Sequence, residues 1–275
     1  MRSRATCITY IEMQNGCKQM AEIYCGLQSY NDEALDIMLE SSKIDGIIMG
    51  DLFCQKRMYD GGTPKMFEML SRVGESGKRL IFQTPLYNPE QVFEQTAEQL
   101  AFIDRRFPGS AVSTSDIGIA SWAMKECSNL TLVWNRFGRS RENYHSGSFF
   151  SFLKMMGFVG FETDLLAEAR RASKEVEPWL VYGAEKYNSM GRICYYRYQL
   201  GQDSMNCEKY CRNAEYEMRL KENGQSFSID GYILGERRSY YDNFFKLCAE
   251  IYPQVILVLA KNEQELESHL GEIRN

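Results

Sequence analysis

Histidine is scarce in this sequence, with two residues in 275, His145 and His269. A Ser-His-Asp or Cys-His protease site needs an imidazole as its base, so two scattered histidines give such a site little support. The zinc-protease motif H-E-x-x-H is absent as well. We expect His269 to be exposed on a helix near the end of the chain.

Long apolar runs are also missing. No stretch approaches the roughly 20 apolar residues that span a bilayer, and residues 1–20 hold no apolar core of a secretory signal. We therefore expect no membrane association and a location in a reducing cytoplasm. In that compartment, the nine cysteines point to metal or redox chemistry rather than to disulfides.

The overall composition is that of an ordinary globular protein, with 44% hydrophobic and 25% charged residues. The net charge of −5 argues against a general nucleic-acid binder, although a local basic patch would still allow RNA binding. The expected ligand is a small molecule.

Short apolar runs alternate with helical patterns along most of the chain. We expect strands at residues 23–27, 44–50, 79–84, 110–113, 130–134, 158–162, 179–182 and 255–259. We expect helices at residues 32–41, 63–76, 89–106, 149–156, 165–175, 240–250 and 262–270. This order predicts an α/β fold, a (β/α)8-like barrel forming a single domain over residues 1–275. A doubly wound open sheet is the alternative.

Functional groups of such a barrel lie in the loops that follow the carboxyl ends of the strands. Three loops qualify here, at residues 51–62, 135–146 and 183–212. The last is too long for a plain barrel loop, and loops of that length usually carry a function. We therefore expect a long cysteine-bearing loop near the carboxyl face of the strands.

The long loop holds three cysteines, Cys194, Cys207 and Cys211, and Cys54 in the first loop is the natural fourth. Four thiolates suit either an iron–sulfur cluster or a structural Zn²⁺. The spacing C-x12-C-x3-C lacks the C-x2-C pairs typical of zinc ribbons, which favours iron–sulfur. The alternative is that these are ordinary buried cysteines.

The same loop resembles the signature of peptidase family U-32, the collagenase-like group. That signature contains Gly-Arg, Cys, Gly-[Arg or Gln]-Asp and Cys-x3-Cys-Arg. The matching residues are Gly191, Arg192, Cys194, Gly201, Asp203, Cys207, Cys211 and Arg212. The stretches MGDLFCQKR at residues 49–57 and SDIGIASWA at residues 115–123 are similar to further motifs of the family.

This resemblance implies a barrel-like fold and a 4Fe–4S cluster on Cys54, Cys194, Cys207 and Cys211. Family members hydroxylate aromatic rings without O2, in ubiquinone precursors or in RNA bases, with prephenate as the oxygen donor. The ubiquinone members act as pairs of related proteins, so the resemblance also implies a heterodimer. The family was first described as peptidases, so a collagenase-like protease is an alternative, as is a non-catalytic partner with a structural cluster.

Basic residues follow the expected strand at residues 130–134, namely Arg136, Arg139 and Arg141. Guanidinium groups bind carboxylates through two parallel hydrogen bonds, so these residues are candidates for binding a dicarboxylate such as prephenate. A solvated basic loop is the alternative. Asp51, at a strand end, is a candidate acid–base group, with a structural hydrogen-bond acceptor as the alternative.

Overall fold

The computed structural model describes residues 21–27, 32–52, 62–86, 90–136, 147–183, 186–190, 201, 216–219, 226–230, 233–236, 244–260 and 262–274. Within these residues the chain's contacts separate into two compact units. The first comprises Met1–Gly183 and Tyr241–Asn275, and the second comprises Ala184–Tyr240.

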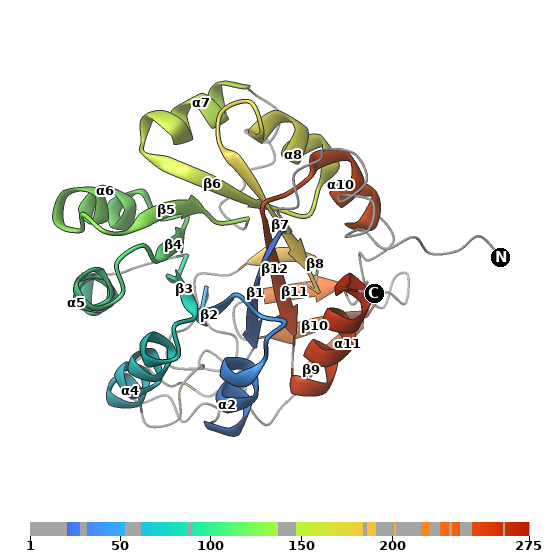
Figure 1. Ribbon diagram of the computed structural model, residues 1–275. Helices are drawn as coiled ribbons and strands as arrows, with labels where there is room; N and C mark the ends of the chain where they lie inside the picture. Colours follow the sequence, from blue (N-terminus) through green and yellow to red (C-terminus); the bar gives the residue numbers. More distant parts are fainter. Residues whose placement is uncertain are drawn as a thin grey trace. The chain divides into compact units, whose positions relative to one another are not determined.

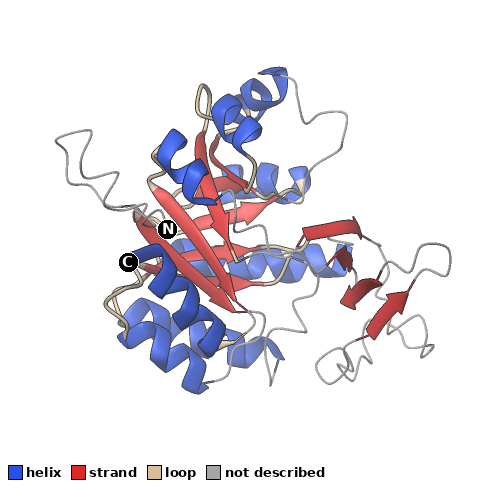
Figure 2. Cartoon of the chain, turned by 90° about the vertical axis from the view of Figure 1, so that its right-hand side faces the viewer, coloured by secondary structure: helices blue, strands red, loops and turns tan. Residues whose placement is uncertain are grey.

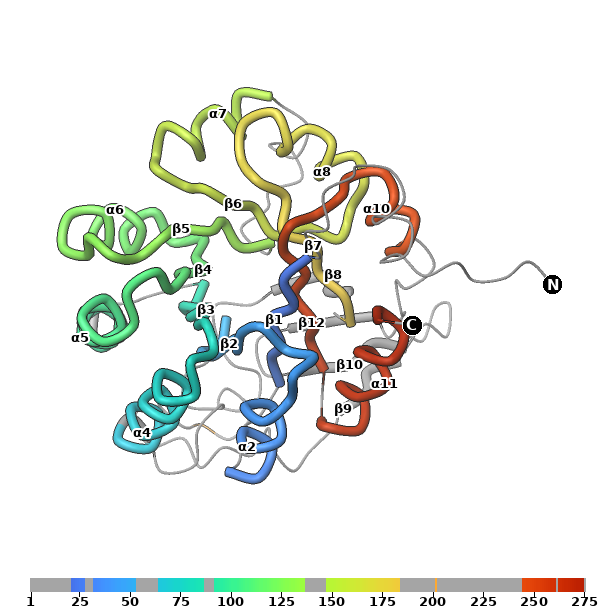
Figure 3. The backbone as a smooth tube through the Cα atoms, viewed as in Figure 1, coloured from blue at the N-terminus to red at the C-terminus, as the bar shows by residue number. Residues whose placement is uncertain are grey.

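The first unit contains a closed barrel of eight parallel strands (Figure 1). The strands are β1 (Glu22–Leu27), β2 (Gly46–Gly50), β3 (Arg79–Gln83), β4 (Ala111–Thr114), β5 (Thr131–Trp134), β6 (Phe158–Thr163), β7 (Glu177–Tyr182) and β12 (Val255–Ala260). Each pairs with the next along the chain, and β12 pairs with β1 to close the ring (Figure 3). The predicted (β/α)8 barrel is confirmed, and the open-sheet alternative is wrong.

A helix follows every barrel strand and lies outside the ring (Figures 1 and 2). The helices are α2 (Asp32–Glu40), α4 (Gly62–Glu75), α5 (Glu90–Arg106), α6 (Ile117–Glu126), α7 (Gly147–Met155), α8 (Leu166–Ala172), α10 (Phe244–Ile251) and α11 (Glu263–Arg274). None of the helices in the described part of the chain is both long and apolar enough to cross a membrane.

Helix α6 has no counterpart among the helices expected from the sequence. It lies in the stretch SDIGIASWA, and Asp116 is its N-cap. The Asp116 carboxylate accepts hydrogen bonds from the backbone N–H groups of Gly118 and Ile119, at 2.8 and 3.2 Å. These bonds satisfy donors that a helix leaves open at its first turn. The Ser-Asp motif therefore begins a helix in this protein.

Strand residues alternate between the helix layer and the barrel interior. The side chains that pack beneath the helices include Cys25, Phe82, Val112, Leu180 and Val258, all in one buried apolar cluster. Their neighbours along each strand consequently face the interior.

The amino-end half of that interior is filled by aromatic rings. Tyr24 and Trp179 stack with ring centroids 6.4 Å apart. Neighbouring strands make room for the rings with glycine, since a Cβ on Gly46 would lie 2.3 Å from the Tyr24 ring and one on Gly160 would lie 2.9 Å from Trp179 Nε1. The Arg79 guanidinium lies 5.6 Å from the Tyr24 ring centroid. This half is closed by packing.

The second unit contains a four-stranded antiparallel sheet in the order β8-β11-β10-β9. Its strands are β8 (Lys186–Met190), β9 (Tyr216–Arg219), β10 (Ser226–Asp230) and β11 (Ile233–Glu236). The expected cysteine loop at residues 183–212 overlaps this unit, but its cysteines lie outside the described residues. The single domain expected over residues 1–275 stays a prediction.

Candidate functional site

Polar side chains gather in the carboxyl-end half of the barrel, where four neighbouring strands end. They are Gln83 on β3, Ser113 on β4, Asn135 directly after β5 and Glu162 on β6. All four are buried, with Ser113 and Asn135 fully inaccessible and Glu162 only 1% exposed. We call these four residues the interior polar cluster.

The residue that precedes each member of the cluster shows which way the side chain of that member points. Phe82, Val112, Trp134 and Phe161 all belong to the apolar layer beneath the helices. Phe161 contacts Phe150 of α7 edge to face, with ring centroids 5.1 Å apart. Because successive residues of a strand point to opposite faces, the next residue of each strand is directed into the barrel.

Hydrogen bonds join the members of the interior polar cluster. The Ser113 hydroxyl donates to Glu162 Oε1 at 2.5 Å, and Asn135 Nδ2 donates to Ser113 Oγ at 3.3 Å. The backbone N–H of Arg136 also donates to the Glu162 carboxyl group. Glu162 is therefore held from β4 and from the end of β5.

Opposing effects act on the protonation of Glu162. Burial raises the pKa of its carboxyl group above the ordinary value because desolvation disfavours the charged form. The hydrogen bond from Ser113, the positive charge and backbone N–H of Arg136, and the nearby Gln83 amide act against this rise. The result is a raised pKa for a carboxyl group that nevertheless has partners able to stabilise its anion.

Gly50, the last residue of β2, allows the strands to approach closely at this level. Its φ is +91°, and a Cβ there would lie 2.1 Å from the backbone oxygen of Gln83. Residues with side chains rarely adopt this backbone conformation. Glycine is thus required both by the backbone conformation and by the position of Gln83.

Hydroxyl groups on the outer face fix the starts of the loops around the site. Thr84 Oγ1 donates to Thr114 Oγ1 at 2.8 Å, joining the ends of β3 and β4. Thr163 Oγ1 donates to Glu168 Oε2 at 2.6 Å and accepts from the N–H of Leu165. These bonds hold the strand ends that carry Ser113 and Glu162.

Of the three arginines predicted to bind substrate, Arg136 is the one within the described residues. It is 5% exposed, and its charge acts on Glu162. The alternative of a solvated basic loop is therefore wrong for Arg136. Arg139 and Arg141 lie outside the described residues. Asp51 is buried at the end of β2, and its acid–base role stays a prediction.

The four predicted cluster ligands, Cys54, Cys194, Cys207 and Cys211, all lie outside the described residues. In the described part of the chain, no group of three or more Cys, His, Asp and Glu residues could hold a metal ion.

Three other cysteines are buried in the barrel unit, namely Cys25, Cys127 and Cys248. Burial raises the pKa of the Cys127 thiol to about 11 and raises that of Cys25 as well. A thiol with a raised pKa is a poor metal ligand and nucleophile. These cysteines are structural, as their apolar sequence surroundings indicate.

His269 is buried, with 4% of its surface exposed, so the expectation of an exposed histidine is wrong. Its ring meets Tyr182 edge to face, with centroids 5.1 Å apart. Burial lowers the pKa of His269. Its helix α11 packs against β12, and the imidazole fills the layer between that helix and the strands.

The interior polar cluster was not predicted from the sequence. The available signal is a polar residue at the last inward-facing position of an apolar strand. These residues are Gln83 in RLIFQ, Ser113 in AVST and Glu162 in FVGFET. A glutamate in the last two residues of a buried strand is the clearest example, because carboxyl groups are rarely buried without a partner. Among the charged residues around the cluster, the sequence pattern indicates Arg136 but not Glu162.

The fold of this chain is similar to that of a solved structure whose title reads "The Structure of the U32 Peptidase Mk0906". The match has a TM-score of 0.52 at 12% sequence identity and covers 89% of this chain and 94% of the other. The structural likeness agrees with the resemblance to the U-32 family noted on the cysteine motif. No protein-family model matches the sequence, and no curated protein matches it.

Proposed function

We propose that this protein is an iron–sulfur enzyme of the U-32 type, or a subunit of one, which takes part in the oxygen-independent hydroxylation of a small aromatic or related substrate. The oxygen donor would be a prephenate-type carboxylic acid. The proposal is supported by the cysteine spacing in the sequence and by the U32-like barrel fold. A reducing cytoplasm and a related partner subunit belong to the same proposal.

One observation carries the placement of the substrate site. Ser113, Asn135 and Glu162 are joined by hydrogen bonds in the carboxyl-end half of the barrel, and Gln83 is buried at the same end. Barrel enzymes carry out their chemistry at this end. A small ligand with several oxygen atoms can exchange hydrogen bonds with such polar groups, whereas a hydrophobic ligand cannot.

Arg136 is the proposed contact for a carboxylate of the substrate or donor. It is the second residue after β5 and is buried beside Glu162. A guanidinium in a largely desolvated position binds a carboxylate more strongly than one in water. Arg139 and Arg141, three and five residues further on, are proposed to assist.

The proposed cluster ligands are Cys54, Cys194, Cys207 and Cys211. Four thiolates match the donor set of a 4Fe–4S cluster, and zinc is the alternative occupant. Such a cluster, when bound, would supply electron transfer or activation of an oxygen-containing ligand. Cys54 is the second residue after Leu52, which is bonded through its backbone oxygen to the N–H of Leu86 at 2.7 Å.

The peptidase alternative has one feature in its favour, the hydroxyl of Ser113 beside the Glu162 carboxyl group. Both residues lie in the barrel interior and are almost fully inaccessible. A polypeptide substrate requires an open cleft, so the buried position favours a small molecule. His269 lies in the outer layer against Tyr182, away from this pair, and does not provide a base for Ser113.

Metal analysis of protein purified without oxygen tests the proposal. Wild type should contain iron and sulfide in equal amounts, about four of each per chain, with a broad visible absorption. The absorption should disappear in Cys194→Ala and Cys207→Ala. Cys127→Ala is the matched control, because Cys127 is buried in the barrel unit and should leave the iron content unchanged.

A different metal content would change the assignment of the cysteine site. About one zinc per chain would indicate a structural metal site. Absence of both metals would remove the iron–sulfur assignment. If iron is present, hydroxylation of candidate aromatic acids should be measured without O2, with and without prephenate. Peptide hydrolysis that persists after removal of the metal would favour the peptidase alternative.

A further inference from the structure

The carboxyl group of Glu162 is unusual for its position. It is 1% exposed in the barrel interior, and a carboxylate without compensation is very unfavourable there. The residue in register with it on β7 is Trp179, which carries no charge. The charged group that acts on Glu162 is Arg136, from the end of β5. A hydrophobic residue would fill the same space at lower energetic cost.

The surroundings of Glu162 suit both protonation states. As a neutral acid it is favoured by burial, and as an anion it accepts from Ser113 at 2.5 Å and from the N–H of Arg136. Asn135 donates to Ser113 Oγ, which leaves the Ser113 hydrogen directed at the carboxyl group. A residue that exchanges protons during a reaction needs such access to both states.

We propose that Glu162 is the acid–base residue of this barrel and exchanges one proton with an oxygen atom of the ligand held beside Arg136. This inference rests on the substrate site of the proposed function. In the forward step, the O–H bond of Glu162 breaks and an O–H bond forms on the ligand. The resulting carboxylate keeps the hydrogen bond from Ser113, and Glu162 regains a proton from water after the product leaves.

Within this arrangement Ser113 and Asn135 are positioning residues. Ser113 holds the carboxyl group through its hydrogen bond, Asn135 orients the Ser113 hydroxyl, and neither contributes a proton of its own. Removal of the Ser113 hydroxyl takes away a bond that stabilises the anion, so it should raise the pKa of Glu162 further.

Glu168 provides a matched control. It is a second buried glutamate, 2% exposed, and it also accepts a short hydrogen bond from a hydroxyl, that of Thr163 at 2.6 Å. Thr163 points to the helix layer, since it meets α8. Glu168→Gln therefore changes a buried carboxyl group of the same kind outside the proposed site.

Infrared spectra recorded across a pH titration give the first test. The carbonyl band of a buried, protonated carboxylic acid should persist above the usual pH range of glutamate in wild type and in Glu168→Gln. The Glu162 component of this band should be absent in Glu162→Gln, and Glu177→Gln identifies the component of Glu177, whose pKa burial also raises. In Ser113→Ala and Arg136→Met the Glu162 component should persist to higher pH than in wild type, because both changes remove stabilisation of the anion. A band that is unchanged in Glu162→Gln would overturn the assignment.

Infrared difference spectra with prephenate as the probe give the second test. Transfer of the Glu162 proton to the bound ligand removes the carbonyl band of the protonated acid without any net proton exchange with the solvent. We expect this loss on binding to metal-loaded wild type, Glu168→Gln and Glu162→Asp, and no such change in Glu162→Gln. A merely structural role of Glu162 would leave the wild-type band unchanged on binding. Thermal unfolding should confirm that each variant is folded.

The outcomes separate this inference from the function on which it rests. Binding of prephenate with no change in the carbonyl band of Glu162 would overturn the role of Glu162 and leave the proposed function standing. An iron–sulfur protein that fails to bind prephenate would overturn the inference, since no ligand would then receive the proton. Absence of the metal together with absence of binding would overturn the proposed function itself.

Discussion

The two halves of the barrel interior are filled with opposite kinds of side chain. The amino-end half holds Tyr24 and Trp179, stacked over glycines that make room for the rings. The carboxyl-end half holds Glu162 and its hydrogen-bonding partners, where apolar residues would pack at lower cost. Because both halves belong to the same strands, the difference separates a half that is packed for stability from a half in which polar groups replace apolar packing.

The two halves also differ in where their charged groups lie. Tyr24, at the amino end, meets the partly exposed Arg79, which also forms an ion pair with Glu22 at the rim. Charges there lie at the surface, where water screens them. In the carboxyl half, Arg136 and Glu162 are both buried. Buried charged groups are retained in proteins chiefly where they have a function.

The largest effect is expected for Trp179→Ala in the amino half. Loss of a buried indole should lower the free energy of unfolding by about 3–5 kcal/mol, measured by urea denaturation. A loss below about 1 kcal/mol would mean that the aromatic stack does not stabilise the amino half as its packing indicates.

Gly50→Ala should have the next largest effect, in the carboxyl half. The left-handed backbone of Gly50 and the contact with the Gln83 oxygen should together lower the free energy of unfolding by about 2–3 kcal/mol. Gly77→Ala is the control, because Gly77 also has a positive φ, +73°, but no atom lies within 4 Å of its Cβ position. Equal losses in the two variants would show that backbone conformation alone matters and that the approach to Gln83 does not.

How far the sequence predicts these features depends on their physical origin. The barrel follows from a local pattern, since strands such as Gly46–Gly50 and Arg79–Gln83 are short apolar runs followed by helices. Helix α6 was missed because its signal is a single N-cap residue before an almost wholly apolar stretch. His269 was misplaced because its burial depends on contact with Tyr182, 87 residues away by the numbering.

The interior polar cluster could not be assembled from spacing alone. Ser113 and Glu162 are 49 residues apart, and only the pairing of β4 and β6 with β5 brings Ser113 Oγ within 2.5 Å of Glu162 Oε1. The cysteine motif was visible in the sequence because its spacing is local, yet the residues that form it lie outside the described part of the chain. Sequence and structure therefore contribute different parts of the candidate site.

Glu162→Gln should change the pH dependence of stability in a direction opposite to that of an ordinary surface carboxylate. The pKa of Glu162 is raised in the folded protein above its ordinary value of 4.5. Its contribution to stability is thus complete below that value and is lost as the pH rises toward the folded pKa. The variant should gain stability relative to wild type over this window, by at most about 1.4 kcal/mol per pH unit.

Urea denaturation at a series of pH values measures this difference. Glu168→Gln is again the control, since it removes a buried carboxyl group outside the interior polar cluster. A difference between wild type and Glu162→Gln that stays constant with pH would show that the residue does not titrate in the window. In that case the carboxyl half would resemble the amino half, with polar groups that serve packing alone.

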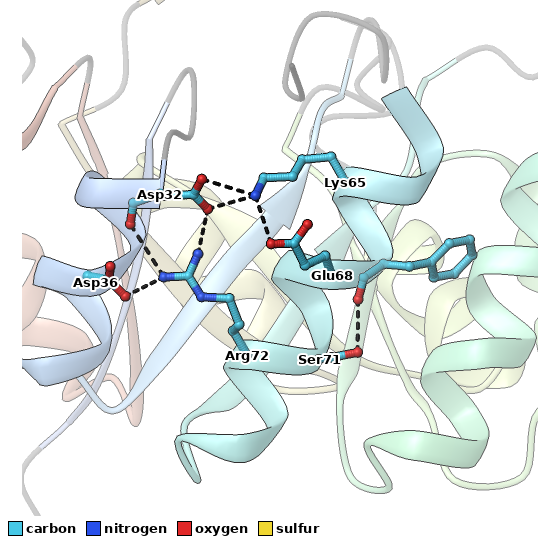
Figure 4. A network of polar contacts seen from close by, with 7 residues as sticks. Asp32, Asp36, Lys65, Glu68, Ser71 and Arg72 are labelled. Carbon is cyan, nitrogen blue, oxygen red and sulfur yellow. Dashed lines mark hydrogen bonds and ion pairs between the residues drawn. The ribbon is translucent and has the colours of Figure 1, made fainter. Parts of the chain in front are cut away.

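The smallest effect is expected outside the barrel, at the ion-pair network between α2 and α4 (Figure 4). Asp32 lies between Lys65, at 2.8 Å, and Arg72, at 2.6 Å. The hydrogen bond and charge of Lys65, together with Arg72, lower the pKa of the Asp32 carboxyl group. The contribution to stability should therefore be present at neutral pH and decrease as acid protonates Asp32.

Asp32→Asn should reduce stability less than any of the changes inside the barrel, because exposed ion pairs are weak and are screened by salt. The loss should disappear in concentrated sodium chloride, whereas the losses from Trp179→Ala and Gly50→Ala should persist there. A salt-insensitive loss would mean that Asp32 acts through helix packing rather than through charge. The salt series thus separates surface electrostatics from the two interior halves, whose energetics depend on packing and on buried hydrogen bonds.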